Sequence, residues 1–157
     1  MEAVAGLIRL LEEQSAVIKD IIAVTEAEIK AIALGDQEGI LEGVGRQERL
    51  ASVLVGLERE RHAMQQVLEK ELSLPENCKL NELLKFLPAE FRDTVSALSK
   101  RLEREVSLLL MLQSRLYFLL QRALTMEETV ARILSRACLR EGSSLLRQRL
   151  SLINRSV

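Results

Sequence analysis

The chain has 157 residues, of which 48% are hydrophobic and only 3% aromatic, with a formal net charge of −1. This length suits one domain with a modest core. Because aromatic residues are scarce and leucine dominates together with other good helix formers, a sheet protein is excluded and an all-α fold is predicted. The charge is unevenly spread, with a net of −6 in residues 1–87 and of +5 in residues 88–157. We expect the two halves to neutralise each other by packing. The alternative is an acidic or nucleic-acid partner for the second half.

No targeting or membrane-spanning segment is expected. The N-terminal stretch "MEAVAGLIRLLEEQ" lacks the basic region of a signal peptide. No stretch reaches the ~18 apolar residues of a transmembrane helix. The two cysteines, Cys78 and Cys138, form no disulfide framework and are expected to be free thiols in a cytoplasmic protein.

The first half of the chain predicts two long helices, over residues 2–34 and 37–72. In the first, apolar residues recur at steps of three and four, and the polar residues Gln14, Thr25 and Glu28 on this seam weaken it. Between the helices, Gly35 suits the left-handed position after a helix end and Asp36 suits the N-cap of the next helix. This tight link predicts an antiparallel hairpin.

Four glycines lie inside the second predicted helix, at positions 39, 43, 45 and 56. Each costs about 1 kcal/mol relative to alanine in a helix interior. Either the first helix approaches closely enough to offset this cost, or the first turns of the second helix are soft.

Residues 73–87 contain a proline and predict a loop with a short helix that Asn81 caps, and a third long helix is predicted over residues 88–124. Its apolar residues recur with the period of 3.5 that is typical of coiled-coil packing, interrupted only by Glu105. The sequence "TMEE" at 125–128 reads as a capping box and predicts a break, followed by a helix over 126–141. An amphipathic, basic tail is predicted over 144–154. The predicted fold is a long antiparallel hairpin plus a third long helix in a coiled-coil-like bundle, with a short C-terminal helix, in a single domain.

No residue pattern supports an enzyme, and we expect no catalytic, metal or cofactor site. The glycines match neither a Walker loop nor a dinucleotide fingerprint. His62, the single histidine, lies on a charged helix face, and the cysteines have no metal-ligand spacing. Nucleic acid is not expected as a partner, because no aromatic residue is interleaved with the C-terminal arginines.

A set of apolar residues near the C-terminus lies outside the main seam of the third helix. Its members are Leu134, Leu139, Leu145, Leu146, Leu150, Leu152 and Ile153. This set either closes the core of the domain or holds an amphipathic helix of a partner.

The order of these elements resembles the FlgN family of flagellar export chaperones. The resemblance rests on the long helix "LLEEQSAVIKDIIAVTEAEIKAIA", the link "LGDQEGI", "RQERLASVL", "NELLKFLP" and "QSRLYFLLQRAL", and it covers nearly the whole length. The family often has a Tyr four residues before a Gly near the C-terminus, and this spacing here joins Cys138 to Gly142.

The resemblance implies an all-helical cytosolic chaperone without ATP chemistry, whose C-terminal segment binds hook–filament junction proteins before type III secretion and hands them to the export gate. Together with the apolar set, it gives a predicted client surface at residues 130–153, with Leu116, Tyr117 and Leu120 above them. Its named members are Leu116, Tyr117, Leu120, Leu134, Cys138, Leu139, Leu145, Leu146, Leu150, Leu152 and Ile153. The competing hypothesis is a structural coiled-coil protein whose seam self-associates, so the oligomeric state stays open.

Overall fold

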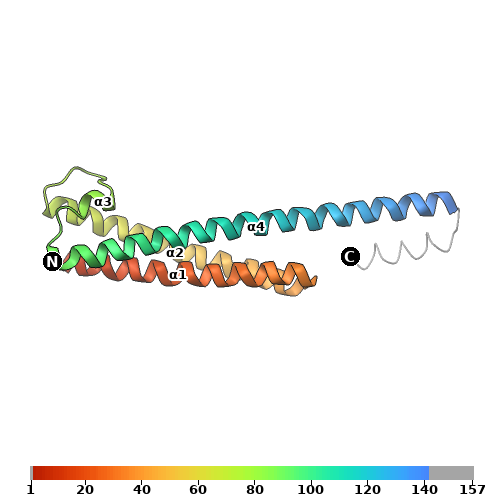
Figure 1. Cartoon of the computed structure of the whole chain (residues 1–157), viewed down its shortest axis with the longest axis horizontal. Coiled ribbons are helices and arrows are strands. Elements are labelled where there is room, and N and C mark those ends of the chain that lie inside the picture. Colours follow the sequence, from red (N-terminus) through yellow and green to blue (C-terminus); the bar gives the residue numbers. More distant parts are fainter. Residues whose placement is uncertain (1, 142–157) are drawn as a thin grey trace. The chain divides into compact units, whose positions relative to one another are not determined.

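The computed structural model describes the backbone of residues 2–141 and the side chains of residues 2–136. These residues form four helices and no strand: α1 (Glu2–Leu34), α2 (Gln37–Glu71), α3 (Leu80–Leu83) and α4 (Ala89–Glu141) (Figure 1). The predicted all-α class is therefore confirmed. Contacts divide the chain into two compact units, one ending at Leu116 and the other beginning at Tyr117, and α4 contributes to both.

The link between α1 and α2 has the predicted chemistry. Gly35 adopts a φ of +68°, which a side chain would strain. The Asp36 side chain caps α2 by accepting a hydrogen bond from the Gly39 N–H at 3.0 Å. The two helices lie side by side as an antiparallel hairpin (Figure 1), so this part of the predicted fold is confirmed.

The glycines of α2 differ in what surrounds them. Gly43 is buried, and a Cβ atom there would overlap the Cγ atom of Glu28 on α1. At Gly56, nothing lies within 4 Å of the place that a Cβ atom would take. Close helix approach, one of the two explanations left open by the sequence, therefore accounts for Gly43 and not for Gly56.

These surroundings predict opposite effects for two alanine substitutions. Gly56→Ala should raise the free energy of unfolding by up to about 1 kcal/mol, because it removes the helix penalty of glycine without a clash. Gly43→Ala should lower it, because the new methyl group has to displace the Glu28 side chain. Urea denaturation of both variants measures the difference, and two changes of the same sign would contradict this packing.

A loop joins α2 to α3 and is held by a buried carboxylate. Glu69 accepts hydrogen bonds from the backbone N–H groups of Asn77 at 3.1 Å and Cys78 at 2.9 Å. The Lys79 N–H donates to Glu82 Oε2 at 3.0 Å, and α3 begins directly after Lys79. The N-cap of α3 is therefore Lys79 and not Asn81, so the predicted capping residue was wrong by two positions.

The core of the first unit joins the ends of the hairpin to α3 and the start of α4. Its buried members come from all four helices and from the segments on either side of α3: Val4, Leu7, Leu11, Leu68, Cys78, Leu83, Leu87, Val95 and Leu98. Farther along, Ser15 Oγ donates to Glu105 and Gln113 Nε2 donates to Thr25 Oγ1, so α4 runs parallel to α1.

The predicted break near residue 125 does not occur. The helix α4 is continuous from Ala89 to Glu141, so the two predicted helices over 88–124 and 126–141 are one. Thr125 Oγ1 donates to the Gln121 carbonyl oxygen at 2.9 Å, one turn back. A threonine inside a helix can donate its hydroxyl in this way while its backbone stays helical. A threonine that acts as an N-cap has non-helical backbone angles instead.

Candidate functional site

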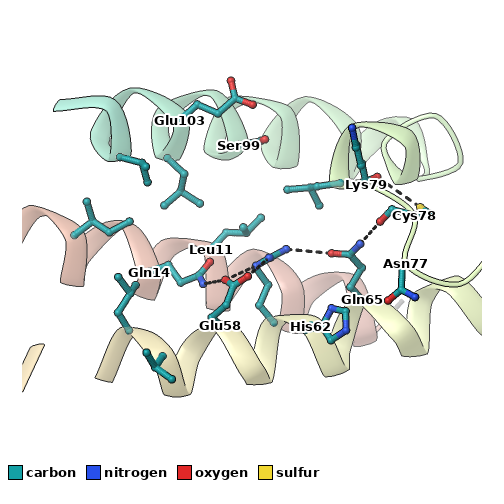
Figure 2. Close-up of a pocket in the computed structure, with 17 residues that line it drawn as sticks. Leu11, Gln14, Glu58, His62, Gln65, Asn77, Cys78, Lys79, Ser99 and Glu103 are labelled. Carbon is teal, nitrogen blue, oxygen red and sulfur yellow. Dashed lines mark hydrogen bonds and ion pairs between the residues drawn. The ribbon is translucent and has the colours of Figure 1, made fainter. Parts of the chain in front are cut away.

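A groove of about 750 Å³ opens between α2 and α4 over α1 in the first unit (Figure 2). Its apolar lining includes Leu11 and Ile18 of α1, Leu54 of α2, and Leu102 and Val106 of α4. The loop before α3 closes one end, where Asn77 and Cys78 line it.

A chain of polar side chains follows the groove along α2. Gln14 Nε2 donates to Glu58 Oε2 at 2.7 Å, and Arg61 Nε donates to the same oxygen at 3.0 Å. Arg61 Nη1 donates to Gln65 Oε1 at 3.1 Å, and the Gln65 amide donates to the Cys78 carbonyl oxygen (Figure 2). The Arg61 hydrogen bond lowers the pKa of the Glu58 carboxyl below its ordinary value, despite partial burial. These side chains satisfy one another and fix the position of the loop.

The groove brings together no nucleophile and base among its described residues. Burial, with the negative charge of Glu69 nearby, raises the pKa of the Cys78 thiol, which therefore stays protonated and unreactive. His62 also lines the groove, but the hydrogen bond that it makes among the described residues is to Gln66, at 3.3 Å, and not to Cys78. Across residues 2–136, no group of three or more potential ligands is placed to hold a metal ion.

A second polar cluster lies deeper in the hairpin and connects three helices. Gln47 Nε2 donates to Thr25 Oγ1 at 2.9 Å and to Glu28 Oε2 at 3.1 Å. Gln113 Nε2 donates to Thr25 Oγ1 and to Gln47 Oε1. The polar residues Gln14 and Thr25 of the α1 seam, which were predicted to weaken it, are buried, and each has a hydrogen-bond partner on another helix. Such pairs stabilise one helix register over its neighbours.

Glu28 is the member of this cluster whose hydrogen bonding is incomplete. Its Oε1 atom is buried without a hydrogen-bond partner among the described residues, and burial raises the pKa of its carboxyl. A raised pKa in the folded state means that folding favours the protonated acid. The contribution of Glu28 to stability is therefore fully present below the ordinary value of 4.5 and is lost as the pH rises through the folded pKa.

Glu28→Gln should therefore raise the melting temperature at neutral pH and bring little change in acid. Thermal unfolding followed by circular dichroism across this pH range measures the effect. The exposed residue Glu60 provides the matched control, because Glu60→Gln removes the same charge from the surface. A melting curve that depends on pH equally in both variants would contradict the burial of an unsatisfied carboxylate.

The seam of α4 changes from buried to exposed along the helix. Leu112 and Leu116 are each only 6% exposed in the first unit. The same period of 3.5 continues into the second unit, where Met126 is 70%, Val130 50% and Ile133 61% exposed. We call the apolar row from residue 119 onward the distal seam; it comprises Leu119, Leu120, Ala123, Met126, Val130, Ile133 and Leu134. All residues of the second unit that the structure describes belong to α4, so within that unit no other described element packs on this row.

The sequence-predicted client residues fall into three groups. Leu116 is buried in the first unit and offers almost no exposed area, which corrects its assignment to a binding surface. Tyr117 and Leu134 are exposed and Leu120 is half-buried, so these three remain candidates. Seven further predicted residues lie outside the described side chains: Cys138, Leu139, Leu145, Leu146, Leu150, Leu152 and Ile153.

The predicted client surface at residues 130–153 included Val130 and Ile133 without naming them, and it missed Met126. Their signal was present, because the 3.5-residue period of the α4 seam reaches them without a change of phase. The predicted break at Thr125 concealed this continuity.

No family model, curated protein or solved structure matches this chain. Among the described helices, none combines the length and the apolar character needed to cross a bilayer.

Proposed function

We propose that this protein is an export chaperone that holds an amphipathic helix of a client on the distal seam of α4. The observation that carries the proposal is the exposure of an apolar seam that is buried in the first unit and continues with the same period. Side chains of a neighbouring helix can pack between the residues of a seam with this period, as they do in coiled coils. Contiguous exposed apolar rows of this kind mark interaction surfaces in soluble proteins.

The size of the distal seam limits what it can hold alone. Burying one large aliphatic side chain contributes about 1.5–3 kcal/mol. Association and the ordering of a client helix cost about 4–15 kcal/mol. Met126, Val130, Ile133 and Leu134 are 45–70% exposed, so each gains only part of this value and together they do not offset the cost. A tight complex needs more apolar area, which the predicted amphipathic tail over 144–154 would supply; this tail lies outside the described residues.

The resemblance to the FlgN family indicates the class of client. The clients would be hook–filament junction proteins, held in the cytoplasm through an aggregation-prone terminal helix and released to the flagellar export gate by exchange. Holding of this kind requires no catalytic group and no cofactor.

Size-exclusion chromatography with light scattering tests the proposal, using the full chain with and without a flagellar junction protein from the same cell. The proposal expects a defined complex that contains both proteins and has a fixed stoichiometry. An oligomer of this chain alone that ignores the junction protein would refute it and favour self-association through the same seam.

A further inference from the structure

One face of α4 carries arginines and exposed apolar side chains but no acidic residue. Arg101, Arg104, Leu108, Met111 and Arg115 recur at steps of three and four and therefore lie on one side of the helix. We call these five residues the arginine face. All five are exposed, Met111 by 61%. At the rise of 1.5 Å per residue, the face extends for about 21 Å within the first unit.

Within the described residues, the arginines of this face form no ion pair. In residues 2–136, no carboxylate lies within ion-pair distance of Arg101, Arg104 or Arg115. An open depression of about 420 Å³ lies at the start of the face, lined by Asp93, Ser96, Ala97, Lys100, Arg101 and Arg104. The face therefore presents guanidinium groups without an ion-pair partner in the described residues, next to a concave surface.

We propose that the arginine face binds an anionic, phosphate-bearing lipid surface. A guanidinium group matches a phosphate with two parallel hydrogen bonds, which an ammonium group does not. The apolar stem of each arginine can lie along the acyl boundary while its guanidinium group contacts the headgroups. Leu108 and Met111 enter the boundary between headgroups and acyl chains. The helix lies in the plane of the surface, as an interfacial helix does.

Within the second unit, α4 carries a further aromatic residue and three arginines: Phe118, Arg122, Arg132 and Arg136. The Arg122 guanidinium lies 5.7 Å from the centre of the Phe118 ring, so the aromatic and cationic groups share one side of the helix. Within the first unit, the arginine face and Lys100 at its edge carry four basic residues, at the lower end of the range of about 4–8 that is typical of segments that bind acidic lipids.

The apolar residues distinguish a lipid surface from other polyanions. A nucleic acid backbone binds arginines through its phosphates, but it offers no apolar region in which a leucine and a methionine between them could be buried. The lipid proposal therefore requires contributions from both kinds of side chain, whereas binding to nucleic acid requires only the arginines.

Vesicle co-sedimentation tests the proposal with the full chain. We expect binding to phosphatidylcholine vesicles that contain phosphatidylglycerol, little binding to phosphatidylcholine alone, and loss of binding in high salt. Arg104→Glu with Arg115→Glu should lower the partition coefficient at least about tenfold. Leu108→Ser with Met111→Ser should also lower it.

The matched control reverses two exposed arginines of α2, Arg49→Glu with Arg59→Glu, and changes the net charge by the same amount. This control should bind nearly as the original chain does. Absence of binding, equal loss in the control, or equal binding to phosphatidylcholine alone would overturn the proposal. Equal binding to a short RNA, unaffected by Leu108→Ser with Met111→Ser, would also overturn it and identify a general polyanion site.

Discussion

Replacing Met126 and Ile133 together with aspartate is expected to weaken client binding by at least about a hundredfold. Each substitution removes the burial of a large apolar side chain, worth about 1.5–3 kcal/mol, and places a charge in the contact. Both side chains are more than half exposed in the described chain, so the thermal unfolding of the first unit should not change. Isothermal titration calorimetry with the C-terminal segment of a junction protein measures the affinity.

The control for this experiment is a pair of exposed apolar residues on α2. Leu41 and Val53 are 73% and 51% exposed, and their replacement with aspartate adds the same charge away from the distal seam. This variant should retain the client. Equal loss of affinity in both variants would show that the added charge, and not the seam, is responsible.

Replacing Leu116 with alanine should lower the free energy of unfolding, whereas it should have no direct effect on contact with the client. Leu116→Ala leaves a cavity in a nearly closed site, and such substitutions cost about 2–5 kcal/mol. Val130→Ala, on the same helix but half exposed, should change the free energy of unfolding by no more than about 0.5 kcal/mol. Urea denaturation compares the two variants.

If the two variants were equally stable, the buried part of the α4 seam would not end at Leu116. If Leu116→Ala were harmless, the first unit would not close at this residue. If Val130→Ala were as costly as Leu116→Ala, the distal seam would be covered in the free chain.

Local signals were sufficient to predict the helices and the hairpin. Gly35 and Asp36 act within one turn of the chain, and the α4 seam from Val95 to Leu116 follows from its period alone. The error at Thr125 came from the same kind of reasoning. A capping box identifies residues that can begin a new helix, but the strong helix formers around it, such as Leu124 and Met126, keep the helix continuous.

The polar contacts could not be predicted, because their partners come from different helices. Gln14 meets Glu58 across the hairpin, and Thr25 meets Gln113 from α4. In the sequence each of these residues is a polar interruption of an apolar row. The groove likewise depends on the loop that Glu69 holds through Asn77 and Cys78, and a sequence pattern does not reveal that contact.

Hydrogen exchange of the full chain, with and without the C-terminal segment of a junction protein, tests the central claim most directly. The proposed function predicts slower amide exchange in residues 119–136 on addition of the segment, because a bound helix stabilises that part of α4 against local opening. Unchanged exchange there, with new protection confined to the groove between α2 and α4, would contradict the claim and move client binding to the first unit.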